Sequence, residues 1–262
     1  MKFSTLSLAV LTALAAGSVS AQTYTVKIGG GYIDPRATSG DIEGTLPDHV
    51  GGTVTAPPGN HLEVMPKATL LISIERAFDD HWAAELVLGA PPTHDVKLRV
   101  GDTVKAGAAQ ANAIFTAAGG SSAGTVIPYL ATNVYSGLGA GAVAAATAAY
   151  KQLATAALIS SYDGAKVAKV KQTAPTLFLN YKFLDASSAL RPYVGVGINY
   201  TNFKVTSTAA GDALYNDGPV RISSTDSIGL AFQVGANYKF DKNWLVSASW
   251  ATAGVKNNVT ID

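Results

Sequence analysis

Hydrophobic side chains alternate with small or polar ones along seven separate segments of the chain. A period of two places one set on each face of a β-strand, so each segment predicts a strand whose two faces meet different surroundings. The segments span residues 24–32, 69–75, 82–88, 176–183, 194–200, 227–240 and 244–250. We expect most of them to approach the roughly 9–11 residues of a tilted membrane strand.

The connections between these segments alternate in length, with short turns at 79–81, 185–189 and 241–243 and long loops at 34–67, 93–173 and 203–225. This asymmetry is typical of transmembrane barrels, although a soluble lipocalin-like barrel also alternates its side chains. Aromatic residues favour the membrane, because they gather near both predicted ends, where lipid headgroups lie. They are Tyr24, Phe78, Trp82, Phe183, Phe240 and Trp244 near the short turns, and Tyr32, Tyr200 and Trp250 near the long loops.

Composition supports an apolar environment. Of the 262 residues, 14% are charged, well below the roughly 25% of an ordinary soluble domain. The formal charge of +1 argues against a nucleic-acid partner, which needs a basic surface, and the absence of cysteine excludes a disulfide scaffold.

The N-terminus predicts a signal peptide over residues 1–21. Lys2 supplies the positive charge, residues 6–16 form an apolar stretch, and Val19-Ser20-Ala21 is a small-residue cleavage site. An exported chain without a stop-transfer helix favours the outer membrane of a Gram-negative cell, with outer-membrane lipid as its surroundings. Residues 22–262 are then the barrel.

One segment, 105–165, breaks the alternation. It is rich in Ala, Gly, Thr and Ser and carries almost no charge. We interpret it as an insertion in the second extracellular loop, with one marginal helix near 139–160. A flexible loop and a lid over the barrel mouth are equally compatible with this composition.

Several short stretches resemble the OmpW family of outer-membrane barrels. The most specific is the run Arg191-Pro192-Tyr193-Val194-Gly195, which continues to Thr201. Further matching pieces lie at 27–35, 82–86, 174–177 and 243–246. The resemblance implies an eight-stranded antiparallel transmembrane β-barrel and passive uptake of small hydrophobic molecules. It also implies a last strand ending in an aromatic residue, which the barrel-assembly machinery recognises. Because the sequence stops at Asp262, soon after the seventh predicted strand, we expect that the last strand is missing from it or that the barrel closes in another way.

The face opposite the lipid-facing set should line the lumen. Its apolar members predict a binding surface for a solute, and they are Leu71, Val87, Phe178, Ala231, Leu245 and Ala251. Its charged members lie near short turns or the mature N-terminus and predict a paired polar floor at the periplasmic end, made of Lys27, Glu75, Glu85, Lys182 and Lys239. Glycines on this face either keep a cavity open or let a small barrel twist.

No catalytic pattern is evident. The four histidines lie in loops and turns without metal-site spacing, and no Gly-x-Ser-x-Gly elbow is present. We therefore expect no enzyme, no metal and no cofactor. The leading hypothesis is passive passage of a small hydrophobic solute through the lumen and sideways into the membrane. The alternative is a structural or adhesive barrel, without transport, that phage, bacteriocins or other surfaces contact through its long loops.

Overall fold

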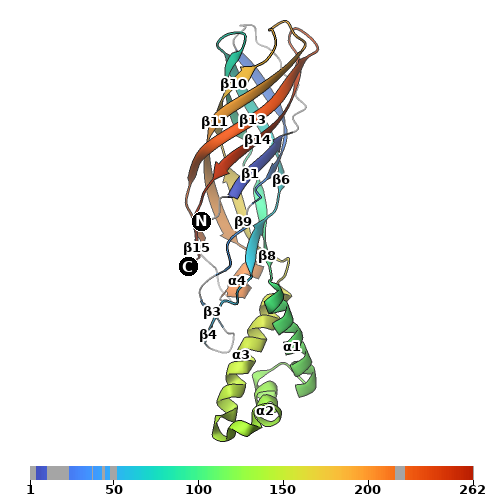
Figure 1. The fold of residues 1–262 in the computed structure, drawn as a ribbon, viewed down its shortest axis with the longest axis vertical. Helices are drawn as coiled ribbons and strands as arrows, with labels where there is room; N and C mark the ends of the chain where they lie inside the picture. Colours follow the sequence, from blue (N-terminus) through green and yellow to red (C-terminus); the bar gives the residue numbers. More distant parts are fainter. Residues whose placement is uncertain are drawn as a thin grey trace.

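The computed structural model describes residues 4–10, 24–36, 38–42, 45–47, 52–215 and 222–261. A long antiparallel sheet curls into a barrel, and a helical unit projects from one end (Figure 1). The short turns lie at the opposite end of the barrel, as the sequence predicts.

Strand pairing closes the barrel into a ring in which every neighbouring pair is antiparallel. The ring order is β10, β7, β6, β2, β1, β14, β13 and β11, and β11 pairs again with β10. The strand bounds are β1 (Ser4–Val10), β2 (Tyr24–Asp34), β6 (Lys67–Ala77), β7 (Trp82–Gly89), β10 (Thr176–Lys182), β11 (Leu190–Ser207), β13 (Ser227–Lys239) and β14 (Leu245–Val255). All seven segments that the alternation predicted are strands of this ring, so the all-β barrel prediction is confirmed.

The position between β14 and β2 holds β1, which the sequence pattern does not predict to be a strand. Seven residues of β1 pair with β14, and three of them also pair with β2. The predicted signal peptide covers these residues, while its remaining parts lie outside the described residues. Cleavage after Ala21 would remove β1 and leave two strand edges without this partner. N-terminal sequencing of membrane-extracted protein, starting at Met1 or at Gln22, would distinguish the two assignments.

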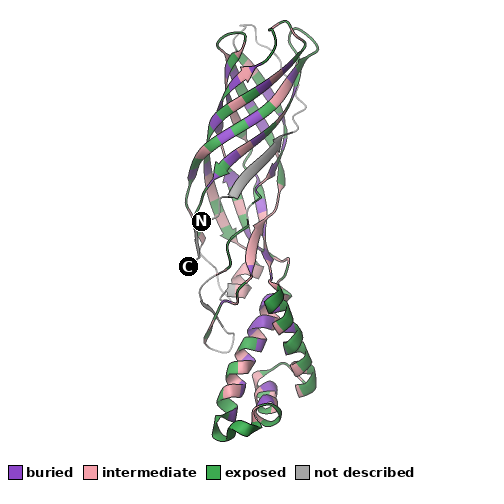
Figure 2. Cartoon of the chain, in the orientation of Figure 1, coloured by how far each residue is buried: buried purple, intermediate pink, exposed green. Residues whose placement is uncertain are grey.

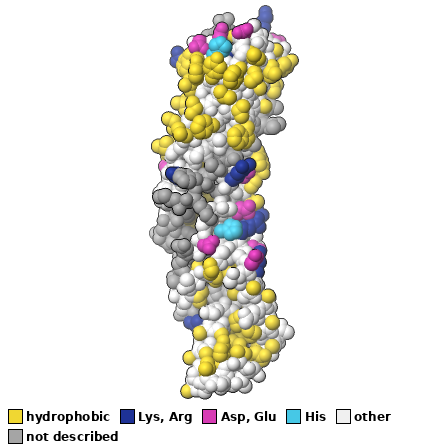
Figure 3. All heavy atoms as spheres, viewed as in Figure 1, with side chains coloured by type: hydrophobic (Ala, Val, Ile, Leu, Met, Phe, Trp, Pro, Cys, Tyr) yellow, Lys and Arg dark blue, Asp and Glu magenta, His cyan; other side chains and the backbone are white. Residues whose placement is uncertain are grey.

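The two faces of the barrel strands differ along their length (Figure 2). In β2, for example, Lys27, Gly29 and Gly31 are buried inside, whereas Ile28 and Tyr32 are exposed outside. On the face of the barrel drawn in Figure 3, large hydrophobic side chains form a broad band. Charged residues border this band near the short turns and at the outer end of the barrel, the end that continues toward the helical unit. Ile228 and Leu230, with exposed fractions of 75% and 63%, would be costly in water and fit a hydrocarbon environment.

Beyond the barrel, the wall continues on one side as a smaller sheet, which we call the outer sheet and which the sequence pattern did not predict. The strands β5 (His61–Val64), β8 (Thr93–Arg99) and β9 (Lys166–Thr173) pair in this order, and β9 pairs with the outer end of β11. Short peripheral elements are β3 (Thr45–Pro47), β4 (Thr53–Thr55), α4 (Ala209–Tyr215), β12 (Ile222–Ser224) and β15 (Val259–Ile261).

The predicted insertion is a compact helical unit, which corrects the expectation of one marginal helix. It contains α1 (Asp102–Ala118), α2 (Ala123–Asn133), the 3₁₀ helix η1 (Ser136–Gly141) and α3 (Ala142–Ser161). The helices bury Val126, Leu130 and Tyr150 between them, and the Tyr150 hydroxyl donates to the Ser121 carbonyl at 3.0 Å. The stretch Ser136–Ser161 is long and apolar enough for a membrane span by length and composition, and Tyr150 and Leu153 within it pack against α2 in the core of the unit.

Candidate functional site

The end of the lumen near the short turns is crossed by a buried charge network, which begins with two carboxylates. Glu75 on β6 lies directly opposite Glu85 on β7 in the strand register. Like charges directly opposite each other destabilise a sheet. Here Lys27 from β2 lies between them, with its Nζ 3.0 Å from Glu75 Oε2 and 2.9 Å from Glu85 Oε1. All three residues are at most 4% exposed, so the charges neutralise one another away from water.

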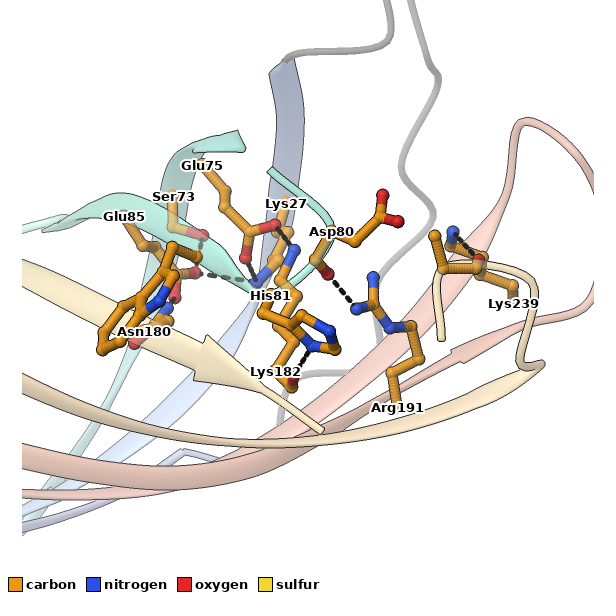
Figure 4. A network of polar contacts seen from close by, with 12 residues as sticks. Lys27, Ser73, Glu75, Asp80, His81, Glu85, Asn180, Lys182, Arg191 and Lys239 are labelled. Carbon is orange, nitrogen blue, oxygen red and sulfur yellow. Dashed lines mark hydrogen bonds and ion pairs between the residues drawn. The ribbon is translucent and has the colours of Figure 1, made fainter. Parts of the chain in front are cut away.

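Side chains from further strands complete this network (Figure 4). The Lys182 ammonium on β10 pairs with Glu75 Oε1. Glu85 accepts hydrogen bonds from Ser73 at 2.7 Å, from Asn180 at 2.9 Å and from Gln233 at 3.1 Å. We call the seven residues the lumen floor: Lys27, Ser73, Glu75, Glu85, Asn180, Lys182 and Gln233. Because they come from five different strands, their hydrogen bonds tie opposite parts of the barrel wall together.

The structure brings together four of the five predicted charged residues and leaves Lys239 out. Its Nζ lies at the exposed end of β13 and donates to the Ala186 carbonyl at 3.3 Å. The prediction failed there because parity gives the face of a side chain but not its depth. A cation that the sequence did not single out, Arg191, is buried at the same end and donates to the carbonyls of Asp80 and Leu184.

Asn180, Gln233 and Ser73 were also missed, although a usable signal was present. Each lies on the same face of its strand as the predicted lumen residues, and only charged side chains had been selected from that face for the floor. Inward parity combined with any hydrogen-bonding side chain would have found all three.

Above the floor, the lumen contains an apolar pocket with a cavity volume of about 40 Å³. Five of the six predicted lining residues contact it, namely Leu71, Val87, Phe178, Ala231 and Ala251. Leu245 does not, because it begins β14 opposite Lys239 and therefore lies at the short-turn end of the barrel. Ile33 and Ala253 extend the apolar lining, and Gln172, Thr176 and Asn199 give it a polar side.

Inward glycines leave room that neighbouring side chains fill. A Cβ at Gly31 would come within 2.5 Å of Leu71 Cδ1, so the leucine occupies that space. A Cβ at Gly195 would overlap Asn180 Oδ1, and one at Gly235 would come within 2.6 Å of the Tyr193 ring. These glycines thus admit large side chains from adjacent strands rather than leaving a wide channel.

Among the described residues, no group of three or more His, Asp or Glu side chains could hold a metal ion. His61, His81 and His94 lie apart on different elements, and His49 lies outside the described residues. The imidazole of His81 contacts the Lys182 carbonyl at 2.9 Å beside the short turns. In that turn, hydrogen bonds from the backbone N–H groups of Trp82 and His81 lower the pKa of Asp79 below its usual value.

Comparison with known proteins identifies the family of this barrel. The model of the OmpW family matches residues 102–262, which is more than half of the chain. The chain belongs to the OmpW family. Proteins of this family are outer-membrane barrels of Gram-negative bacteria, and the family is not a known enzyme family. The chain is therefore an outer-membrane barrel that sits in lipid.

Named relatives match the OmpW chain over part of its length. Outer membrane protein W of Escherichia coli is 43% identical over 88 residues, which are 32% of this chain and 38% of the relative. Outer membrane protein W of Vibrio cholerae is 35% identical over 94 residues, 36% of this chain and 42% of the relative. The matched segments thus span less than half of these proteins.

Solved structures align with the chain along most of its length but at low similarity. OprG from Pseudomonas aeruginosa aligns over 98% of this chain and 96% of its own, with 16% identity and a TM-score of 0.46. AlkL in lipid bilayers aligns over 98% of this chain and 90% of its own, with 15% identity and a TM-score of 0.37. The barrel assignment therefore rests on the strand pairing of the chain itself.

Proposed function

We propose that this barrel lets small hydrophobic molecules pass from the outer end of its lumen sideways into the membrane, without energy coupling. One observation carries the proposal: an apolar pocket lies directly above a floor of paired charges. The apolar lining accepts a hydrophobic solute, because burial of its surface away from water is favourable. The floor opposes passage of water and ions toward the periplasm, since its charges are already paired.

A break in the barrel wall beside the pocket supports the sideways exit. β7 ends at Gly89 and β8 begins at Thr93, while β9 ends at Thr173 and β10 begins at Thr176. The two gaps contain Pro91, Pro92 and Pro175, which have no N–H to donate to a neighbouring strand. Gly89, Pro92 and Ala174 also line the pocket, so the pocket reaches this irregular part of the wall, where the Gln172 N–H donates to the Pro92 carbonyl at 3.0 Å.

The pocket must widen for a solute larger than a few water molecules, because each water needs roughly 10–15 Å³ of such volume. Leu71 is the side chain whose movement would widen it most directly. Its methyl groups lie against Gly31 and Gly89, which have no side chains to restrict their movement. We propose that Leu71 swings within this space when a solute enters.

Solute uptake tests the proposal. Gram-negative cells that produce the full chain should take up a labelled alkane or small aromatic faster than cells without it. Ala174→Phe should slow this uptake, because a ring at this position fills the exit. Ala90→Phe is the matched control, since Ala90 is exposed in the same gap and does not line the pocket. Uptake equal to that of cells without the protein would overturn the proposal.

Ion conductance tests the floor. In planar bilayers, Glu75→Ala/Glu85→Ala should raise the single-channel conductance, because it removes the acceptors that hold Lys27 and Lys182 in place. Glu63→Ala/Asp95→Ala removes the same charge from the outer sheet and should leave the conductance unchanged. An unchanged conductance in the floor variant would mean that these side chains do not close the lumen.

A second candidate function, recognition of other surfaces, is favoured by the helical unit. Val134, Leu138 and Val143 are each more than half exposed at its far end. Replacing residues 102–163 by a short Gly–Ser linker separates the two functions. Gly164 donates to the Leu98 carbonyl at 2.8 Å, so the two ends already lie together. We expect uptake to persist in this variant, whereas loss of cell or phage attachment alone would support recognition.

A further inference from the structure

The outer end of the pocket holds one buried polar group that its surroundings leave unused. Gln172 is 2% exposed and lines the pocket, and one end of its side-chain amide has no hydrogen-bond partner among the described residues. Its backbone N–H is satisfied by the Pro92 carbonyl at 3.0 Å, which fixes the residue beside the break in the wall. Native structures keep few such buried unpaired groups, so each one calls for a reason.

The other polar side chains of the pocket lining are already satisfied. Asn199 donates to the Thr176 hydroxyl at 2.8 Å, and its own carbonyl oxygen accepts from Thr201 at 2.5 Å. Thr252 also has an interaction. Gln172 is therefore the lining residue with an unpaired side-chain atom in the part of the chain that the structure describes.

The buried ring of His94 interacts with the Gln172 amide. His94 is 1% exposed, and its Nδ1 lies 2.8 Å from the Met65 carbonyl. A carbonyl only accepts, so Nδ1 carries the hydrogen and Nε2 keeps its lone pair. Because Nε2 can only accept, the amide nitrogen is the end that faces the imidazole, and the amide oxygen is left for a solute.

We propose that Gln172 is a selectivity site that favours small hydrocarbons carrying one hydroxyl group over plain alkanes. The inference rests on the proposed function and adds the chemistry of the preferred solute. The amide oxygen accepts from the solute hydroxyl, and the hydroxyl oxygen can in turn accept from an amide hydrogen. An alkane offers neither, so its entry leaves the buried amide oxygen without a partner.

The size of the preference follows from the worth of one neutral hydrogen bond. Loss of such a bond at a buried site corresponds to about a tenfold change in occupancy. Below saturation, the uptake rate follows the occupancy of the pocket, so 2-octanol should enter about ten times faster than octane through the same barrel. Rates are taken as the difference between cells with and without the protein, which removes direct permeation through lipid.

Gln172→Leu tests the site. It keeps the size of the side chain and removes both hydrogen-bonding atoms, so the alcohol preference should vanish while octane uptake persists. Gln110→Leu is the matched control, because Gln110 is exposed on α1 in the helical unit and should keep the preference. Gln172→Met serves as a second apolar variant, and the barrel fold of each is checked by its resistance to heat in detergent.

The outcomes separate this inference from the proposed function. Uptake of both solutes with an unchanged preference in Gln172→Leu would overturn the role of Gln172 and leave transport intact. Uptake of neither solute by the unaltered chain would overturn transport and this inference with it. A further measurement uses the unaltered protein in lipid nanodiscs, where 2-octanol but not octane should shift the ¹⁵N resonance of the Gln172 side chain. Equal responses to the two solutes would contradict the inference.

Discussion

The two ends of the lumen close in different ways. At the floor, charged and amide side chains from five strands fill the cross-section, and Lys27 alone holds two carboxylates within 3.0 Å. At the outer pocket, small and branched apolar residues meet without filling the space, and a cavity of about 40 Å³ remains. The same alternating strands thus build a tightly bonded end and a loosely packed end.

This difference indicates which end can move. Breaking the floor requires separating several buried ion pairs and hydrogen bonds together, because each carboxylate has more than one partner. Opening the pocket requires only that apolar side chains change position against neighbours that do not bond to them. A solute path that uses the loose end and avoids the tight end follows from this contrast.

The largest effect is expected from Lys27→Met. This change removes the shared cation and leaves Glu75 facing Glu85 across two strands. Breaking a buried ion pair by removing one partner costs about 3–5 kcal/mol, so the free energy of unfolding in lipid should fall by that amount. Urea-induced unfolding followed by tryptophan fluorescence measures it.

A second substitution sharpens this result. Adding Glu85→Gln to Lys27→Met removes one of the two facing charges and should recover part of the lost stability. If the double variant is no more stable than Lys27→Met alone, repulsion between the two carboxylates is not the cause of the loss.

A smaller effect is expected from Leu71→Ala at the loose end. Truncation of a buried leucine typically costs about 2–5 kcal/mol, and we expect the lower part of this range because the side chain already borders a cavity. The larger pocket should at the same time raise uptake of a hydrophobic solute. Leu70→Ala is the control, since Leu70 is 52% exposed on the outer face. Faster uptake in the control alone would place the solute path outside the lumen.

The sequence predicts the strands of the barrel wall but not which lumen side chains pair with one another at the floor. Alternation of apolar and small residues depends only on which face each side chain takes, and this local property located all seven predicted strands. The pairing of Lys27 with Glu75 and Glu85 depends on the register between β2, β6 and β7, which a single strand does not encode. Lys239 has the right parity, but its position at the end of β13 keeps it out of the floor.

The outer sheet and helical unit were missed for a related reason. β8 carries Asp95 and Lys97 on one face and has His94 on the other, and β9 carries three lysines, so neither strand has the long apolar stripe of a membrane strand. The helical unit is stabilised by contacts between helices, with Val126, Leu130 and Leu153 in one shared core. Its Ala- and Gly-rich composition is compatible with a loop, and tertiary packing decides the outcome.

Acidification should weaken the outer sheet next to the pocket. Burial lowers the pKa of His94 below its usual 6.5, so the unfolded chain binds the proton first as the pH falls. The stability that His94 contributes is therefore complete above pH 6.5 and is lost as the pH drops from there through the pKa of the folded state. Asp95 keeps its charge in this window, because Lys166 lowers the pKa of its carboxyl below 3.8.

Amide hydrogen exchange in β8 and β9, corrected for the intrinsic rate at each pH, measures this loss between pH 7.5 and 5. His94→Gln removes the titrating group, so exchange protection in this variant should not change over the same range. If the variant and the unaltered chain lose protection equally, another group is responsible for the acid sensitivity.

The smallest effect is expected from Lys239→Ala, which tests whether the floor ends where the structure places it. Lys239 shares the inward parity and the charge of Lys27 and Lys182, yet its ammonium donates to a single exposed carbonyl, that of Ala186. Exposed substitutions of this kind usually change stability by less than about 0.5 kcal/mol. Urea unfolding and single-channel conductance should therefore match those of the unaltered chain. A conductance increase comparable to that of Glu75→Ala/Glu85→Ala would mean that the barrier reaches down to the short turns, and that the closed end is set by overall charge rather than by the buried contacts of Lys27.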